Sequence, residues 1–329
     1  MAAEGDRRYR TYMGEDGEII PREATHIFVG ECTFVRAEAF LLHPNIVEII
    51  FHDKVEKIEA GAFQNCKKLR RVIMPGVKIL EARAFYLCRA LADVECGKLE
   101  IIGDAAFGHC YSLRSINLPS ARIVEEESFV FCEALSDVKF DSKLERFGRS
   151  PFMNCYSLER ITIPLKDNLF DESGSTFMGC WRLKHVALVE GELQETIAAL
   201  QLEEWRNDMS EEINSINNDL LNSPAGRWHS EWNYDEGGKA GAINTWIRSV
   251  MRKIIHYIAE HQRVLNEATV LLELAIWKAN LDDTDGGRNV RERVRTTRGS
   301  VKRARRELCV TSGSSIVIKN VLPFLELKS

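Results

Sequence analysis

The sequence AFQNCKKLRRVIMP at residues 62–75 returns with the same spacing as AFYLCRALADVEC at residues 84–96 and as AFGHCYSLRSINLP at residues 106–119. Each copy has a phenylalanine at its second position. Seven phenylalanines follow one another at steps of 22 to 25 residues: Phe40, Phe63, Phe85, Phe107, Phe129, Phe152 and Phe177. A fixed period in the low twenties indicates a solenoid, in which each repeat forms one coil. We number the coils 1 to 7 by these phenylalanines and count positions from them.

Further positions repeat along with the phenylalanine. Position +3 is cysteine in six copies, and positions +6, +9 and +11 are apolar. The residues at +9 and +11 alternate with positions expected to be exposed, which is the period of a half-buried strand. A second apolar pair at −8 and −5, such as Val55 with Ile58, predicts a second short strand on another wall. One coil cannot bury its own apolar face, so the coils must stack into a rod about 30 Å long.

The chain has nine cysteines, and six of them occupy position +3: Cys66, Cys88, Cys110, Cys132, Cys155 and Cys180. Because they recur once per coil on one wall, we interpret them as a ladder of small buried thiols that fill the turns and bond backbone carbonyls. Zinc is the alternative, but it needs four converging ligands, and no C-x-x-C pair occurs in the chain. We expect no metal and no cofactor.

The pattern A-F-x-x-C-x-x-L-x-x-[VI]-x-[LMFI]-P resembles the BspA-type leucine-rich repeat over about residues 18–189. This resemblance implies an interaction module: some members of the family sit on microbial surfaces and act in adhesion, and others are intracellular. The rest of the chain is similar to uncharacterised repeat proteins expanded in diatoms, through IPRE at residues 20–23, LELAIWKA at residues 272–279 and IVIKNVLPFL at residues 316–325. That second resemblance implies an architecture and no activity.

The composition is that of an ordinary soluble globular protein, with 45% hydrophobic and 28% charged residues. A formal net charge of −5 gives no general attraction to nucleic acid or to an anionic membrane. The first residues are polar and charged, unlike a secretory signal, and no run of about 18 apolar residues exists. We therefore expect an intracellular, cytoplasmic protein without a membrane partner, and a nuclear location is the alternative.

Changes in pattern divide the chain into four parts. We predict a flexible N-terminal arm at 1–17, a solenoid with an N-terminal cap at 18–189, an antiparallel helical hairpin at 190–281, and a basic arm with an apolar docking segment at 282–329. The predicted fold class is therefore α+β, a leucine-rich-repeat β-solenoid of about seven coils followed by a long-helix hairpin.

Apolar residues recur every three or four positions from Leu193 to Leu220 and again from Ile243 to Ala279, which indicates two amphipathic helices. The stripe of the second helix either faces the first helix, in a hairpin that closes the solenoid, or pairs with another copy as a coiled coil, which would make a homodimer. His256, Glu260 and His261 lie on this helix, but His261 falls on a different side and no further metal ligand is indicated.

Basic residues dominate the stretch that follows the second helix: Arg288, Arg291, Arg293, Arg295, Arg298, Lys302, Arg303, Arg305 and Arg306. Such a stretch is either a solvated arm or helix face, or else a nuclear address or phosphate contact. A nucleic-acid-binding or nuclear factor that acts through 288–306 is therefore the alternative function, and it predicts salt-sensitive binding.

Positions +8 and +10 are expected to form an exposed ladder, the surface that a solenoid presents to partners. The candidate partner-binding residues are Glu48, Arg71, Asp93, Glu95, Asn117, Asp137, Lys139, Arg160 and His185. Their mixed charges favour a protein partner, since nucleic acid would require a basic stripe. The sequence has no G-x-S-x-G elbow, P-loop or G-x-G-x-x-G after a strand. We therefore predict a non-enzymatic protein-interaction module, and an enzyme with scattered site residues is a weaker alternative.

Overall fold

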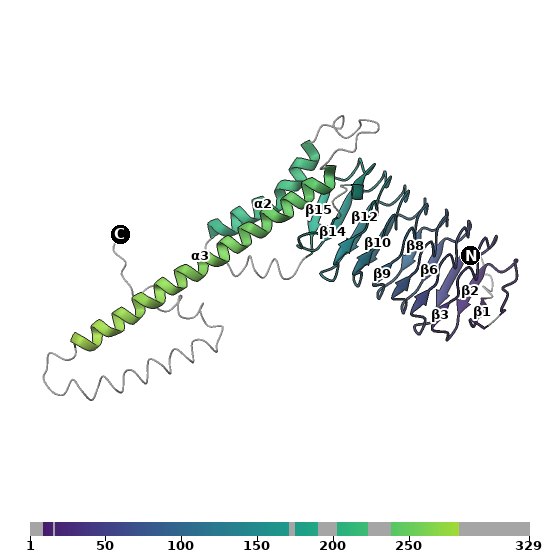
Figure 1. Cartoon of the computed structure of the whole chain (residues 1–329), viewed down its shortest axis with the longest axis horizontal. Coiled ribbons are helices and arrows are strands. Elements are labelled where there is room, and N and C mark those ends of the chain that lie inside the picture. Colours follow the sequence, from purple (N-terminus) through teal and green to yellow (C-terminus); the bar gives the residue numbers. More distant parts are fainter. Residues whose placement is uncertain (1–8, 16, 171–174, 190–202, 223–237, 283–329) are drawn as a thin grey trace, which may run out of the picture. The chain divides into compact units, whose positions relative to one another are not determined.

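The chain forms a series of short strands followed by two helices (Figure 1). The computed structural model describes residues 9–15, 17–170, 175–189, 203–222 and 238–282. Two compact units, Met1–Ile254 and Ile255–Ser329, divide the chain within its second helix. The first unit contains the solenoid, helix α2 (Glu203–Asn222) and the beginning of helix α3 (Gly238–Asp282).

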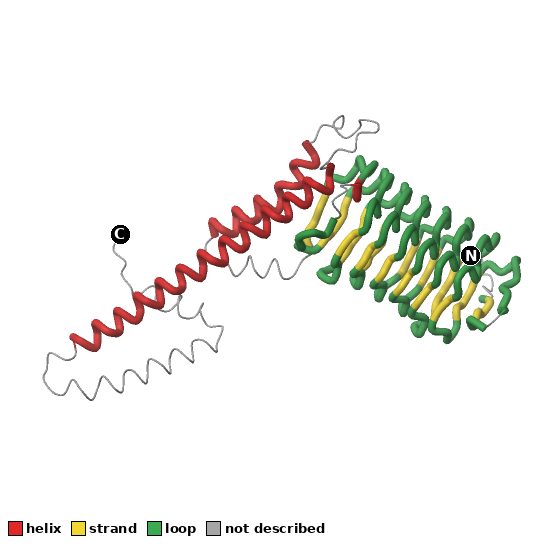
Figure 2. Tube along the Cα trace, in the orientation of Figure 1, coloured by secondary structure: helices red, strands yellow, loops and turns green. Residues whose placement is uncertain are grey.

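Successive coils contribute parallel strands to two walls (Figure 2). The front wall comprises β1 (Arg10–Tyr12), β2 (His26–Val29), β4 (Glu48–Phe51), β6 (Arg71–Ile73), β8 (Asp93–Glu95), β10 (Ser115–Leu118), β12 (Asp137–Phe140), β14 (Arg160–Ile163) and β15 (His185–Leu188). The back wall comprises β3 (Phe34–Val35), β5 (Lys57–Ile58), β7 (Ile79–Leu80), β9 (Ile101–Ile102), β11 (Ile123–Val124) and β13 (Arg146–Phe147). The predicted second strand is thus confirmed.

The front wall consists of two sheets, because the strand pairing is interrupted between β8 and β10. A third wall, the turn wall, consists of the A-F-x-x-C turns from position −2 to position +5. In coil 7 this turn begins with a short 3₁₀ helix, η1 (Ser175–Phe177). The solenoid with its BspA-type repeat spacing is the architecture that the sequence predicts.

The seven repeat phenylalanines form one continuous stack through the core. The centroids of neighbouring rings lie 4.7 to 5.8 Å apart, and their planes differ by 5° to 13°. All seven side chains are buried. These separations are those of favourable offset-stacked rings, and they follow from the strand spacing of roughly 4.8 Å between coils.

The six repeat cysteines form a second ladder beside the rings. Each Sγ donates a hydrogen bond to the main-chain oxygen of the phenylalanine in the preceding coil, at S···O distances of 3.0 to 3.3 Å. Burial raises the pKa of Cys132 to about 12, so this group is a thiol at neutral pH and can donate. In coil 1, His43 takes the position, and its Nε2 donates to the Pro21 oxygen at 3.1 Å. The predicted thiol ladder is confirmed.

Strand β1 covers the N-terminal end of the stack. It pairs with β2, and the ring of Tyr12 lies 4.9 Å from that of Phe40 in an edge-to-face arrangement. The prediction of a flexible arm is wrong for residues 10–12, because Tyr12 is only 2% exposed and covers the apolar surface of the first coil. Terminal repeats need such a cover.

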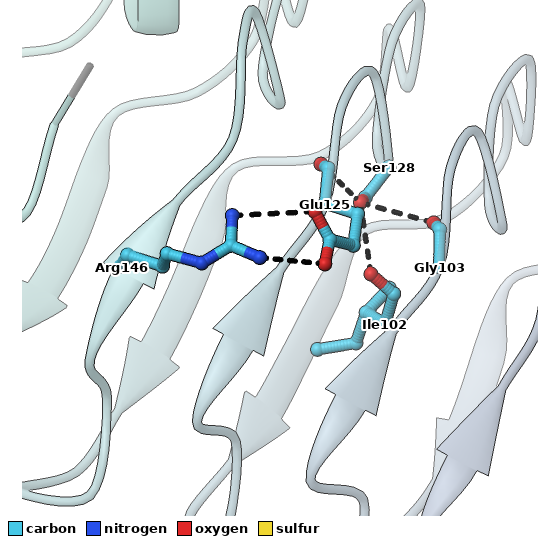
Figure 3. A network of polar contacts seen from close by, with 5 residues as sticks. All are labelled: Ile102, Gly103, Glu125, Ser128 and Arg146. Carbon is cyan, nitrogen blue, oxygen red and sulfur yellow. Dashed lines mark hydrogen bonds and ion pairs between the residues drawn. The ribbon is translucent and has the colours of Figure 1, made fainter.

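The back wall pairs charges between coils, and the adjoining turn wall accommodates a buried hydroxyl at Ser128 (Figure 3). Arg146 binds both carboxylate oxygens of Glu125, at 2.8 and 3.3 Å. Ser128 occupies position −1, which is alanine in coils 1 to 4. Its hydroxyl lies 2.6 Å from the Glu125 main-chain oxygen and 3.2 and 3.3 Å from those of Gly103 and Ile102. A polar group is tolerated at this buried position because backbone carbonyls accept its proton.

Helix α2 and the beginning of α3 form an antiparallel hairpin. Lys253, in the first half of α3, pairs with Asp208 at 3.0 Å. Trp246 lies earlier in α3, and its indole N–H donates to the main-chain oxygen of Glu212, later in α2, at 2.9 Å. Apolar side chains of both helices are buried, among them Met209, Ile216, Ile243, Ile247 and Val250. The hairpin that the sequence predicts is therefore present, with α2 beginning at Glu203. Residues 190–202 lie outside the described residues.

Polar side chains of the hairpin bind backbone groups of coil 7. Asn217 accepts a hydrogen bond from the Val186 N–H of β15 at 2.9 Å. The ammonium of Lys239 donates to the oxygens of Cys180, Trp181 and Leu183 at 2.7, 3.2 and 3.2 Å. In coil 4, the oxygen of Tyr111, which occupies the position of Trp181, accepts such a bond from the Ala134 N–H of coil 5 at 3.2 Å. The hairpin thus supplies hydrogen-bond partners to backbone groups at the C-terminal end of the solenoid.

The second unit contains α3 from Ile255 onward. Arg263 forms surface ion pairs with Glu260 and Glu267 at 2.8 and 3.2 Å. Several large apolar side chains on this part of the helix are exposed: Ile255, Ile258, Val264, Val270, Leu271, Leu274 and Ile276. A homodimer formed through the long helix stays a prediction.

Candidate functional site

The candidate site is the front wall, where the parallel register arranges positions +8 and +10 into columns. Within each of the two sheets, residues at the same repeat position pair directly, as in Glu48 with Arg71 and Asp137 with Arg160. The side chains at +9 and +11 face the core, because successive residues of a strand point to opposite sides. The columns that the sequence predicts are therefore formed, and their role as a binding site stays a prediction.

Glu48 corrects the prediction that all of these residues are exposed. It is only 5% exposed, and its carboxylate accepts a hydrogen bond from the Tyr9 hydroxyl at 2.6 Å. Arg71 also lies 3.6 Å from this carboxylate. Tyr9 precedes β1, so the segment that covers the N-terminal end also covers this side chain. Glu48 is a structural anion and offers little surface to a partner.

Arg71 connects the columns by reaching diagonally to Glu95. Its Nη2 atom lies 2.6 Å from Glu95 Oε1, and both side chains are exposed. An ion pair at the surface contributes only about 0–1 kcal/mol to stability. This pair can therefore be replaced by contacts to a partner at little cost.

The C-terminal half of the front wall carries cations that form no ion pair within the described part of the chain. Asn117, Lys139, Arg160 and His185 are exposed, and Asp93 in the N-terminal half is exposed as well. Among the described residues, neither Lys139 nor Arg160 forms an ion pair. Asp137 differs, because it is half-buried and its Oδ1 is shielded from solvent without a hydrogen-bond partner in the described part of the chain. Lys139 and Arg160 are therefore exposed cations that a partner can reach.

An apolar row lies at the other end of the front wall. Phe28, Ile50 and Ile73 pair in register across β2, β4 and β6, and all three are half-buried. None of them belongs to the candidate set that the sequence predicts. Phe28 could have been recognised by extending position +10 back into the cap. The front wall therefore combines an apolar row with charges of both signs.

The described residues contain no group of three or more histidine, cysteine, aspartate or glutamate side chains that could hold a metal ion. No described helix is long and apolar enough to cross a membrane. The basic residues of 288–306 and the apolar segment at 310–329 lie outside the described residues, so the alternative function rests on the sequence alone.

Comparison with known families matches the repeat region. A model of the BspA type leucine rich repeat region, in six copies, matches residues 33–123 and 100–199, which together make up half of the chain. No curated protein matches the chain. The resemblance to repeat proteins of diatoms is not shown by these comparisons and stays a prediction.

Solved structures of bacterial leucine-rich-repeat proteins are similar to this chain. One from T. pallidum is 21% identical over 55% of this chain and 85% of that chain, with a TM-score of 0.38. One from Bacteroides ovatus is 17% identical over 50% of this chain and 69% of that chain, with a TM-score of 0.24. The pneumococcal vaccine antigen PcpA is 17% identical over 54% of this chain and 65% of that chain, with a TM-score of 0.30.

Proposed function

The chain belongs to the BspA-type leucine-rich-repeat family, and from that premise we propose that it is a non-enzymatic protein-interaction module that binds a protein on its front wall. The observation that carries the proposal is the front wall itself. It aligns unpaired cations, exposed acidic groups and an apolar row on one regular surface. Solenoids offer such extended surfaces to their partners.

The chemistry of this surface favours a protein partner. Nucleic acid requires a continuous basic stripe, whereas acidic residues separate Arg71 from the other cations of the wall. In order along the wall, the charged residues are Arg71, Asp93, Glu95, Asp137, Lys139 and Arg160. A protein surface can complement both signs and can cover the row of Phe28, Ile50 and Ile73.

The size of the front wall sets an expectation for the complex. Nine strands at roughly 4.8 Å spacing and about four residues each give a surface of about 38 by 13 Å. A standard interface covers about 800 Å² on each partner, which is more than this area. The partner is therefore expected to extend onto the adjoining turns or to bind transiently, and experiments should be sensitive to weak complexes.

Reversing the two unpaired cations, Lys139→Glu together with Arg160→Glu, is expected to reduce capture of the partner about tenfold or more, because like charges then meet across the interface. The matched control reverses one lysine and one arginine on the back wall, Lys78→Glu together with Arg122→Glu. Arg122 is exposed and Lys78 is half-buried, and both form surface ion pairs on the back wall. Capture is measured by affinity purification from the native cell extract at two salt concentrations, after nuclease treatment.

The expected result is a defined set of proteins that the unmodified chain and the control retain and the front-wall variant loses. If every captured protein remains on the front-wall variant, binding through the front wall is contradicted. If nuclease treatment removes all captured proteins from the unmodified chain and from the control, the proposal is also contradicted, because nucleic acid then mediates the association.

A further inference from the structure

The turn wall carries an aromatic cluster that the repeat pattern does not require. The ring of Tyr86 in coil 3 meets that of His109 in coil 4 edge-to-face at 5.3 Å, and His109 stacks on Phe131 in coil 5 at 4.8 Å. Tyr111 lies edge-to-face with His109 at 5.6 Å. All four side chains are half-buried, so part of each ring remains accessible. We call Tyr86, His109, Tyr111 and Phe131 the aromatic strip.

Two arginines lie over this strip. The guanidinium carbon of Arg83 is 5.8 Å from the centroid of Tyr86, and that of Arg89 is 5.7 Å from the centroid of Tyr111. In the described part of the chain, neither arginine forms an ion pair. A guanidinium held on an aromatic face keeps its N–H groups in a fixed plane, where they can bind a carboxylate through two hydrogen bonds.

The histidine adds to the apolar character of the strip. The Tyr111 oxygen lies 2.9 Å from Nδ1 of His109. Burial lowers the pKa of His109, and the charge of Arg89 lowers it further. The imidazole is therefore neutral at pH 7, and a single hydrogen bond joins its Nδ1 to the Tyr111 hydroxyl. The strip thus presents neutral rings, with positive charge only from the arginines.

The backbone conformation of the turn wall is unfavourable for two side chains of the strip, those of His109 and Phe131. Position +2 adopts a left-handed conformation in every coil, with φ of 62° at Leu87, 60° at His109 and 56° at Phe131. Coils 2, 6 and 7 have Asn65, Asn154 and Gly179 at this position, the residue types that tolerate it best. A bulky residue is strained in this conformation, and the strip has two such residues, His109 and Phe131.

Gly108 makes room for the first ring of the strip. Its own backbone conformation is not left-handed, but a Cβ atom there would lie 2.9 Å from Cδ2 of Tyr86. Every other coil has a larger residue at this position: Leu41, Gln64, Tyr86, Val130, Met153 and Met178. The glycine is therefore explained by the packing of Tyr86, which is a second departure from the repeat at the same place.

The charges around the strip differ between its two ends. Arg83 and Arg89 lie at coil 3, and the preceding coil has an exposed lysine, Lys67, at the repeat position of Arg89. At the other end, Glu127 and Glu133 of coil 5 are close enough to act on the His109 pKa. A continuous phosphate backbone would be repelled by this acidic end. A short segment with acidic residues at one end and an apolar side chain at the other matches the whole strip.

We propose that the aromatic strip, with Arg83 and Arg89, is a second docking surface of this protein, and that its occupant is an acidic protein segment with an apolar anchor residue. The carboxylates of the segment bind the two guanidinium groups at coil 3. The anchor side chain packs on His109 and Phe131. This surface lies on the turn wall and does not depend on binding to the front wall.

Selection of displayed random peptides on the purified full chain tests this proposal. Enriched peptides are synthesised, and their dissociation constants are measured by fluorescence anisotropy with Phe131→Asn and Arg89→Gln. Phe34→Asn is the matched control, because Phe34 is a phenylalanine outside the strip that is exposed and has an arginine, Arg36, 6.0 Å from its ring centre. A single-stranded DNA oligonucleotide is titrated alongside, and the front-wall variant Lys139→Glu with Arg160→Glu is included.

The enriched peptides are expected to carry acidic residues at one end and an aromatic or aliphatic residue at the other. Their dissociation constants should rise about tenfold or more with Phe131→Asn and with Arg89→Gln, and stay unchanged with Phe34→Asn and with the front-wall variant. Asparagine accepts the left-handed conformation, so the thermal midpoint of Phe131→Asn should equal or exceed that of the unmodified chain.

Four results would overturn the proposal. One is the enrichment of peptides without an acidic bias, or of none. Another is that the selected peptides bind Arg89→Gln and the unmodified chain with equal affinity. Arg89 is exposed, so its replacement leaves the core intact. In the third, the chain binds the oligonucleotide but no peptide, and Phe131→Asn abolishes the binding of the oligonucleotide. The fourth is loss of peptide binding in the front-wall variant alone, which would place the peptides on the front wall and exclude the turn wall.

Discussion

Replacing Phe107 with alanine is expected to lower the free energy of unfolding by about 3–5 kcal/mol. Its ring is fully buried in the middle of the phenylalanine stack, with centroids 5.5 Å from Phe85 and 5.3 Å from Phe129. Removing it deletes two ring contacts and leaves a cavity that the strands on either side cannot close. The measurement is equilibrium denaturation followed by circular dichroism.

The control for this substitution is Phe34→Ala on the back wall. The Phe34 side chain is 39% exposed, so its loss is expected to cost less than about 1 kcal/mol. The contrast between the two variants separates burial in the stack from the general effect of losing an aromatic residue. Equal losses for Phe107→Ala and Phe34→Ala would contradict the stack as the core of the solenoid.

Replacing Lys239 with methionine is expected to destabilise the first unit by about 2–4 kcal/mol. The substitution keeps the length of the side chain but removes the donor to three main-chain oxygens of coil 7. Relief of a buried charge offsets part of this loss, so the expected effect is smaller than the sum of three charged hydrogen bonds. Lys184→Met is the control, since Lys184 is exposed on the same coil. Equal stability of the two variants would contradict capping by the hairpin.

Lys239 also makes the stability difference between the unmodified chain and Lys239→Met depend on pH. Burial lowers the pKa of Lys239 to about 8, from an ordinary value of 10.5. Between these values the unfolded chain binds more protons than the folded chain, so this group adds stability as the pH rises. The difference in unfolding free energy between the unmodified chain and Lys239→Met should therefore grow from pH 8 to pH 10.5. The buried thiols have the opposite effect, but they are common to both proteins and cancel.

The core of the solenoid could be predicted because its signal is repeated. Phe107 and Cys110 have equivalents one period away on both sides, so their burial follows from the spacing alone. The hydrogen bond from each thiol to the phenylalanine of the preceding coil follows from the same register. The antiparallel hairpin could also be predicted, because two amphipathic stripes on neighbouring helices bury each other.

The features that the sequence did not reveal depend on contacts that occur once. Glu48 is buried because Tyr9, 39 residues earlier, lies over it. Lys239 binds carbonyl groups 56 to 59 residues earlier, and nothing in its own neighbourhood indicates this. The aromatic strip lies at positions +1, +2 and +4, where the repeat varies. It could have been found by aligning the coils and comparing these variable positions.

Photo-cross-linking from single positions tests the proposed function most directly. A photoactivatable residue replaces Thr162 on the front wall or, in a matched protein, Ile101 on the back wall; both side chains are half-buried strand residues. Each protein is illuminated in the native cell extract, and its adducts are identified by mass spectrometry. Binding on the front wall predicts a defined protein adduct at Thr162 and none at Ile101. The same adducts at both positions, or adducts at Ile101 alone, would contradict it.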